Sequence, residues 1–435
     1  MTTEKELAGR LYESVRNLPI YDYHNHLDPD WLRHDHIFSD PAELWLASDP
    51  YKHRLMRICG VPEEKITGDA SPREKFDAWC EIFPRLVGTP VYEWSLMELE
   101  LLGIPEKPSG KTAGIIWEKM SRELSFSALY KKFNIAKMSP VASITDDIGW
   151  YKNRPDASPS MRGDSLLSPD SDLISKISSL TGMKIVTLDD YLAAVGILLG
   201  RFADTGCRFA DHAIDDRFEY VEDENATKFF GMPTEDQDDY HRAALASLIL
   251  TRLGNLYEER GFTLLLHLGA MRKTSTRLRE KAGAAGGYAG IGTTDFSSIV
   301  KLLNSMEQSG GLPKTILFPL DPSQFEKAAV LSGSFSKDRT EAIISEGAAW
   351  WWCDHRNGIE RMLDSVAAYS VLDTFVGMTT DSRNILSFVR HDYFRKLVCA
   401  WFAKKLTSGE FSADEEDILP ILRNICHDNA AKLFR

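Results

Sequence analysis

The chain has 435 residues, of which 43% are hydrophobic and 26% are charged, the composition of an ordinary globular protein with ample material for a core. Its formal net charge of −13 argues against nucleic acid or an anionic membrane surface as a partner, because those partners need a face rich in Lys and Arg. An anionic ligand would therefore have to be met by a local group of arginines.

The sequence carries no visible export or membrane signal. Its first 18 residues predict a polar helix, and no apolar run approaches the roughly 20 residues of a membrane span. The 6 cysteines have no C-x-x-C spacing, so we expect reduced thiols in the core. We therefore expect a soluble protein of the cytoplasm.

Short apolar runs alternate with helical patterns, which favours an α/β fold with parallel strands. The eight predicted strands are 19–26, 136–145, 157–162, 207–212, 262–268, 314–320, 348–353 and 375–380. Eight parallel strands with crossover helices predict a (β/α)8 barrel of the TIM type, whose active site lies where the strands end.

Residues 27–135 are too many for one crossover and contain several helical patterns. We therefore predict two parts: a barrel formed by residues 1–26 and 136–435, and a helical insertion formed by residues 27–135 over the barrel mouth. Such an insertion could act as a lid, since the loops after the strands build the active site. The sequence after residue 390 predicts two closing helices.

The first predicted strand ends on His24-Asn25-His26. Residues two apart in a strand point to the same face, so both imidazoles are candidates for a metal site. Chance occurrence of such a pair is the alternative.

Polar residues of functional types also follow the later strands. They are Asp146 and Asp147 after the second, Arg162 after the third, Asp211 and His212 at the fourth, His267 and then Arg272 at the fifth, and Asp381 and Arg383 after the eighth. A barrel would gather them at one mouth. Imidazoles with a carboxylate suit one divalent cation such as Zn²⁺. The alternatives are a core histidine for His267 and a helix N-cap for Asp381.

The arginines that end three different strands form a second candidate group. Arg162, Arg272 and Arg383 could converge on one carboxylate, which the planar guanidinium binds with two parallel hydrogen bonds. The alternative is a set of salt bridges with neighbouring aspartates. A metal together with these arginines would suit a small hydroxy acid.

Histidines after the first and fifth strands with an aspartate after the eighth resemble the metal-ligand pattern of the amidohydrolase superfamily. Longer stretches resemble one family more specifically, the bacterial uronate isomerases. The matching segments are PIYDYHNHL, YKHRLMRICGV, TGDASPREKFDAW, ADHAI, LHLGAMR, LPKTILF, FVGMTTDSRNILSFVRHDYFRKL and ICHDNAAKLF. They occur in family order over nearly the whole chain.

The resemblance implies a hexuronate substrate, interconversion of D-glucuronate with D-fructuronate and of D-galacturonate with D-tagaturonate, and one divalent metal, commonly zinc. It also implies site residues. The metal ligands would be His24, His26 and Asp381, with His267 at or close to the metal; Tyr51 would be the active-site tyrosine, and Arg162, Asp211, Arg272 and Arg383 would surround the sugar acid. Proton transfer through a cis-enediol would need a base, for which Asp381 and Tyr51 are the candidates. We also expect a homo-oligomer.

The chain departs from the family pattern at Pro50, where the family usually has a histidine before the tyrosine. Proline has no side-chain donor, so we expect either slower proton transfer or a replacement from His53, His34 or His36. The alternative for His53 is a position on a solvated helix face. Two other functions stay open from the sequence: a different amidohydrolase reaction, such as lactone hydrolysis or decarboxylation, and a uronate-binding protein without turnover.

Overall fold

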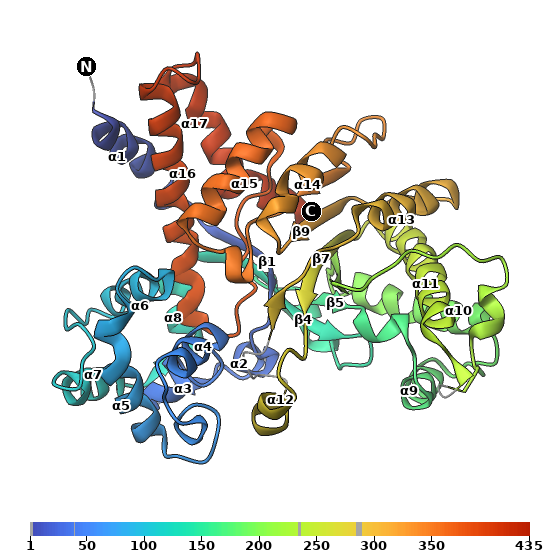
Figure 1. The fold of residues 1–435 in the computed structure, drawn as a ribbon, viewed down its shortest axis with the longest axis horizontal. Coiled ribbons are helices and arrows are strands. Elements are labelled where there is room, and N and C mark those ends of the chain that lie inside the picture. Colours follow the sequence, from blue (N-terminus) through green and yellow to red (C-terminus); the bar gives the residue numbers. More distant parts are fainter. Residues whose placement is uncertain (1–2, 39, 234–235, 284–288) are drawn as a thin grey trace.

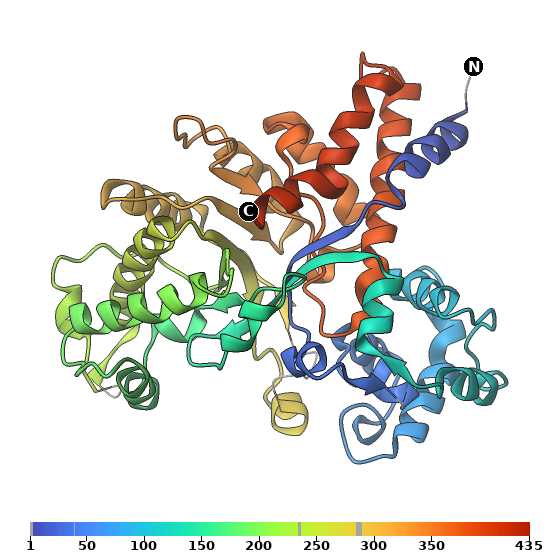
Figure 2. The ribbon, with the colours of Figure 1, turned by 180° about the vertical axis from the view of Figure 1, so that it is seen from behind.

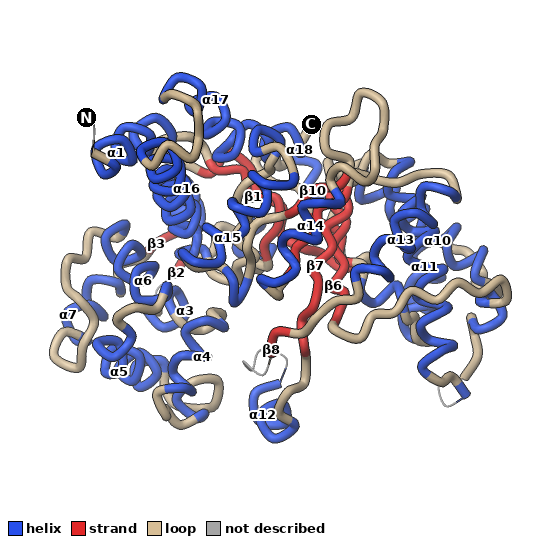
Figure 3. The backbone as a smooth tube through the Cα atoms, turned by 45° about the horizontal axis from the view of Figure 1, so that its top comes forward, coloured by secondary structure: helices blue, strands red, loops and turns tan. Residues whose placement is uncertain are grey.

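The computed structural model describes residues 3–38, 40–233, 236–283 and 289–435. Its centre is a curled sheet of parallel strands surrounded by helices, drawn in red and blue in Figure 3. In spatial order the parallel strands are β1 (Ile20–Asn25), β4 (Ile135–Ser143), β5 (Ser160–Arg162), β6 (Phe209–Asp215), β7 (Thr263–Met271), β9 (Thr315–Pro319) and β10 (Ile344–Glu346). Spatial order follows chain order, as in a (β/α)8 barrel, which confirms the predicted fold class.

The strands form from near-continuous apolar runs because helices cover the outer face of the sheet while the inner face fills the barrel. β7 is the clearest case, since all of its residues except Met271 are buried. The six predicted strands that correspond to β1, β4, β5, β6, β7 and β9 overlap the observed ones. A short antiparallel β8 (Gly290–Ile291) extends β7 beyond the predicted pattern.

The predicted seventh strand, residues 348–353, is wrong. The seventh strand is β10, which pairs with β9, whereas Trp351–Cys353 form a short 3₁₀ helix. The aromatic run has high β-propensity, but Trp351 has a φ of 50°, a left-handed conformation that ends an extended strand. β10 escaped prediction because its last residue, Glu346, is charged in its usual state.

The predicted eighth strand, residues 375–380, also differs from the structure, because this segment has no assigned strand. It nevertheless runs against β1: the Tyr23 hydroxyl donates to the Gly377 carbonyl at 3.0 Å, and the His24 N–H donates to the Thr379 hydroxyl at 2.9 Å. A side-chain donor and a side-chain acceptor thus replace part of the regular backbone ladder. The segment takes the eighth position without regular strand pairing.

Helices lie on both sides of the sheet in Figures 1 and 2. One side carries α10 (Leu188–Ala203), α11 (Asp239–Glu259) and α13 (Phe296–Gln308), and the other carries α1 (Glu4–Val15), α15 (Arg356–Tyr369), α16 (Val389–Thr407) and α17 (Glu415–Arg423). Among the described residues, no helix is both long and apolar enough to cross a membrane.

Residues 27–135 form a separate group of short helices, coloured blue to cyan in Figure 1. They are α2 (Pro29–Arg33), α3 (Pro41–Trp45), α4 (Pro50–Ile58), α5 (Pro72–Ile82), α6 (Pro90–Leu101), α7 (Ala113–Met120) and α8 (Phe126–Lys132). The first five begin with proline, whose fixed φ suits the first turn, and each has an Asp, Ser or Thr cap that accepts backbone hydrogen bonds. Sequence-local signals therefore fix these helix starts.

Glu346, the last residue of β10, is a carboxyl group in an apolar environment. It is 2% exposed, and neither oxygen has a hydrogen-bond partner among the described residues. Burial raises the pKa of Glu346 well above its usual range, although the nearby Ser365 hydroxyl acts in the opposite direction. The folded protein therefore keeps this carboxyl group protonated at pH values where the unfolded chain ionises it.

We expect Glu346→Gln to stabilise the protein at neutral and higher pH. Between the unfolded and the folded pKa of Glu346, the free energy of unfolding should fall by about 1.4 kcal/mol per pH unit, because only the folded state holds the proton. This contribution is fully present in acid and is lost as the pH rises toward the folded pKa. Urea unfolding at about pH 5 and about pH 8 should show an advantage of the variant that widens at the higher pH.

The exposed Glu326, changed to Gln, is the matched control for this measurement. A stability difference between Glu346→Gln and the unchanged protein that does not depend on pH would contradict the expectation.

Candidate active site

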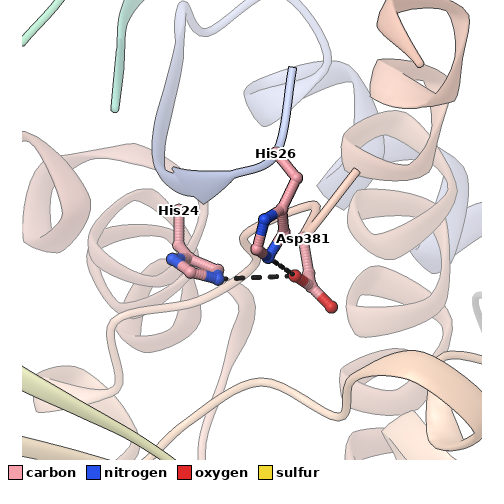
Figure 4. A group of neighbouring side chains, drawn as sticks. All are labelled: His24, His26 and Asp381. Carbon is pink, nitrogen blue, oxygen red and sulfur yellow. Dashed lines mark ion pairs between the residues drawn. The ribbon is translucent and has the colours of Figure 1, made fainter. Parts of the chain in front are cut away.

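His24 and His26 converge on one carboxylate from the last part of the barrel (Figure 4). The Nε2 atoms of His24 and His26 lie 3.3 Å and 3.1 Å from the same Asp381 Oδ1. Strand alternation turns both imidazoles to one side, as the sequence predicts. The three donor atoms lie within 4.8 Å of one another.

Backbone hydrogen bonds hold this group together. The Asp381 N–H donates to the His24 carbonyl at 3.0 Å, and the His26 N–H donates to the Ser382 carbonyl at 2.7 Å. Asp381 has a φ of 47°, a left-handed conformation that Asp tolerates better than most residues. Backbone strain of this kind occurs where surrounding contacts over-determine a conformation, often at functional sites.

Asp211 and His267 form a second group beside the first. His267 Nδ1 lies 2.6 Å from Asp211 Oδ1, and these residues form with His24 another set of donor atoms within 4.8 Å of one another. Asp211 lies on β6 and His267 on the adjacent β7. His24 therefore belongs to both groups, which places His267 next to the group formed by His24, His26 and Asp381.

The electrostatics of the group favour ionised carboxylates. Burial raises the pKa of Asp381, but hydrogen bonds from His24 and His26 outweigh it and hold the pKa well below its usual range. The pKa of Asp211 is likewise lowered: burial acts upward, and His24, His267 and Arg162 outweigh it. Burial lowers the pKa of His26 to about 4, which leaves its imidazole neutral near pH 7.

These donors fit a divalent cation. One carboxylate oxygen sits within hydrogen-bonding reach of two imidazole Nε2 atoms, an arrangement that needs either a proton or a cation among the three. Two nitrogens and one oxygen suit a borderline ion such as Zn²⁺, and a catalytic site keeps further positions for water or substrate. The residues present could therefore hold a metal.

The three predicted arginines differ in what they contact. Arg162 pairs with Asp164 at 2.6 Å and with Asp211 at 3.2 Å. Arg272 pairs with Asp215 at 2.9 Å.

Arg383 has neither an ion pair nor a side-chain hydrogen bond among the described residues, and its side chain is exposed. Desolvation lowers the pKa of Arg383, the cations of Arg162 and Arg272 lower it further, and Asp381 opposes them. Its guanidinium is thus the one of the three whose charge is left without a close partner.

The candidate metal group, Asp211, His267 and the three arginines line one cavity of about 690 Å³. The barrel contributes His24, His26, Arg162, Asp164, Asp211, Ala213, His267, Arg272, Arg279, Ala289, Trp350, Trp351, Trp352, Asp381 and Arg383, and the helical group contributes Ala47, Ser48, Pro50, Tyr51 and His53. The predicted residues Asp146, Asp147 and His212 are not among its lining residues. His212 is buried elsewhere, with its Nε2 2.8 Å from the Tyr257 hydroxyl.

Tyr51 reaches the cavity from the N-terminal turn of α4. Arg390 donates to its hydroxyl at 3.3 Å and also pairs with Asp354 at 2.7 Å. Burial raises the pKa of Tyr51 above its usual value, and the positive charge of Arg390 opposes that rise only in part. The phenol therefore stays protonated near neutral pH.

Of the three histidines considered as replacements near Pro50, only His53 lines the cavity. His53 is 3% exposed, neither ring nitrogen has a hydrogen-bond partner among the described residues, and burial lowers its pKa to about 4. His34 is mostly exposed, and His36 Nε2 lies 2.8 Å from Glu43 Oε1. The two surface histidines therefore play no part in the cavity wall.

Several residues at or behind the cavity wall were not proposed as site residues from the sequence. Trp350–Trp352 form an aromatic part of the wall, and Arg390 and Asp354 form a buried ion pair that contacts Tyr51 from outside the lining. The three consecutive tryptophans have the composition of a strand, so the sequence did not indicate the turn at Trp351. Arg390 lies within a helix, where an arginine usually faces solvent, so no local signal marked it.

A family model described as glucuronate isomerase matches residues 1–434 of this chain. The uronate isomerase of Caldanaerobacter subterraneus subsp. tengcongensis is 35% identical, with 98% of this chain and 96% of that protein aligned. The uronate isomerase of Clostridium perfringens is 32% identical, with 99% and 97% aligned.

Solved structures show the same fold. A uronate isomerase from Thermotoga maritima is similar with a TM-score of 0.89 and 27% identity, over 99% of this chain and 97% of that one. A glucuronate isomerase from Caulobacter crescentus also has a TM-score of 0.89, with 21% identity over 99% and 94%. The barrel architecture and its helical group are thus shared along nearly the full chain.

The metal site gives a direct prediction. We expect the double variant His24→Ala, His26→Ala to lose a bound divalent ion, because it removes two of the three candidate ligands and leaves only Asp381. Elemental analysis of the purified protein after dialysis measures this. His34→Ala, which removes an exposed histidine, should keep the ion; full occupancy in the double variant would place the ion elsewhere.

Proposed function

The chain belongs to the glucuronate isomerase family, and on this premise we propose that it interconverts aldose and ketose forms of hexuronates. The reactions would be D-glucuronate to D-fructuronate and D-galacturonate to D-tagaturonate. One observation supports this most directly: a candidate metal site and the Arg383 guanidinium, which has no ion-pair partner in the part of the chain that the structure describes, line the same cavity. A sugar acid presents the two complementary features, hydroxyl groups and a carboxylate.

Arg383 is our candidate for binding the substrate carboxylate. Its guanidinium has no carboxylate partner among the described residues, so it can form two parallel hydrogen bonds with a ligand carboxylate. Arg162 and Arg272 already pair with aspartates, so their role would be to add positive potential around the anion. Anchoring one end of the open chain fixes the position of the reacting carbons at the other.

The isomerisation moves one proton from C2 to C1 through a cis-enediol, and a second proton passes between the oxygens of the same carbons. We assign to Asp381 the removal of the proton from C2, because its ionised carboxylate can accept that proton. Tyr51, a protonated phenol, would donate a hydrogen bond to a substrate oxygen. When bound, a divalent ion would orient a substrate hydroxyl and lower its pKa.

Zn²⁺ is the ion we propose, because two imidazoles and a carboxylate match its usual ligands. The helices of residues 27–135 would serve as a cover that limits access of water, since Tyr51 and His53 extend from them into the cavity wall. We further propose a cytoplasmic protein that assembles as a homo-oligomer.

The function is tested by incubating the metal-loaded protein with D-glucuronate and, separately, with D-galacturonate. We expect the corresponding ketose to form, detected by chromatography against authentic product. A lactone substrate should give no hydrolysis. Uronate bound without any ketose would indicate a binding protein, and lactone hydrolysis without isomerisation would indicate a different reaction.

The carboxylate assignment predicts a contrast between two arginines. Arg383→Met should lower kcat/KM for uronates roughly a hundredfold, because a bidentate charge-assisted contact is lost. Arg272→Met should lower kcat/KM by less than about tenfold, since Arg272 already has Asp215 as partner. Both variants should retain metal. Equal losses in the two variants, or a larger loss for Arg272→Met, would overturn the assignment.

A further inference from the structure

Trp351 has an unusual backbone for a bulky residue. Its φ is 50°, in the left-handed region where a large side chain is a genuine outlier. It lines the same cavity as Asp381, which is also left-handed. Such strain persists only where neighbouring contacts enforce it, and it concentrates at functional sites.

The two neighbouring tryptophans supply those contacts. Trp350 donates its indole N–H to the Phe318 carbonyl at 2.7 Å, and its ring meets His267 edge to face at 4.8 Å. It is therefore fixed to the barrel.

Trp352 is fixed on the other side, against the helical group. Its ring meets Tyr51 edge to face at 5.6 Å, and the Arg54 guanidinium lies 5.0 Å from its ring centre. With both neighbours held, the backbone at Trp351 has to turn sharply between them.

This turn places Trp351 in the cavity wall, where its ring and its indole N–H could contact a ligand. The ring stacks on Trp352 at 4.8 Å and lies tilted against Trp350 at 5.5 Å, which restricts its motion. The side chain is only partly buried. Its indole N–H, a donor only, has no acceptor among the described residues, unlike the N–H of Trp350.

We propose that Trp351 is a substrate-binding residue whose ring stacks against the C–H face of the sugar-acid chain and whose N–H donates to a substrate oxygen. The electron-rich ring face attracts C–H groups that carry partial positive charge beside oxygen. This inference rests on the proposed function. A rigid aromatic surface in the wall of the cavity that His24, His26, Asp381 and Arg383 also line would restrict the lateral position of the open chain, which neither end contact can do alone.

Binding of a non-reacting ligand tests the proposal without turnover. L-gulonate has the carbon chain and carboxylate of D-glucuronate but no carbonyl group, and its affinity for the metal-loaded protein is measured by calorimetry. Trp351→Phe keeps the ring and should bind about fivefold more weakly, the effect of one lost hydrogen bond. Trp351→Gly loses ring and donor and should bind at least about thirtyfold more weakly.

Two controls separate binding from folding. Glycine adopts a positive φ without strain, so Trp351→Gly should keep its metal content and thermal midpoint. Trp150→Phe removes an indole that stacks on Tyr151 outside the cavity and should leave affinity unchanged. In uronate turnover, the Trp351 variants should raise KM more than they lower kcat.

The possible outcomes are distinct. An affinity of Trp351→Gly within about twofold of the unchanged protein, with fold and metal intact, overturns the proposal. A fall in kcat with unchanged affinity also overturns it, because that result indicates a structural role. If the unchanged protein binds L-gulonate through Trp351 but forms no ketose, the proposed isomerisation fails and this inference stands. If it neither binds L-gulonate nor converts uronates, both are wrong.

Discussion

The junction between β1 and the segment 379–382 is the constraint on which the site depends. Asp22, which is fully buried, accepts the Thr380 N–H at 2.9 Å and lies 2.9 Å from His391 Nε2. These contacts join the start of the barrel to its end, more than 350 residues later in the chain. Because His24 lies two residues after Asp22 and Asp381 lies one residue after Thr380, the same junction fixes the two histidines against the carboxylate. Closure of the barrel and assembly of the candidate metal site are therefore one structural event.

Among the described residues, the buried charges beside the cavity are balanced in pairs, whereas the exposed Arg383 is not. Removing a charge from water is costly unless an opposite charge or hydrogen bonds compensate it. Asp211 is compensated by His267 and Arg162, and the buried Arg390 by Asp354. Arg383 is left without such a partner among the described residues. In an otherwise acidic protein this uncompensated cation determines the sign of the ligand that the cavity favours.

The sequence allowed the fold class and six of the strand positions to be predicted, because apolar runs are local signals. The gathering of His24, His26 and Asp381 was predicted from barrel topology and from the family resemblance. The regions that failed depend on tertiary contacts. Residues 348–353 have the composition of a strand, but anchors on the barrel and on the helical group force a turn at Trp351. β10 contains Glu346, which is tolerated only because burial keeps it protonated. Arg162 and Arg272 form ion pairs with aspartates and Arg383 does not, and this difference likewise cannot be seen in a linear sequence.

The protonation state of Tyr51 decides which of the two candidate residues can act as the base. A phenol whose pKa is raised by burial holds its proton near neutral pH. Tyr51 can therefore donate a hydrogen bond, but it is not the phenolate that would be needed to remove a proton from carbon. The charge of Arg390 opposes the rise of the Tyr51 pKa only in part, and its contact with the Tyr51 oxygen directs the phenolic hydrogen away from the guanidinium. Asp381 is ionised at the same pH. We infer that the carboxylate of Asp381 is the base and that Tyr51, from a helix outside the barrel, is the donor. The position of this donor then depends on the helices of residues 27–135, so a movement of these helices away from the barrel would also remove the donor from the site.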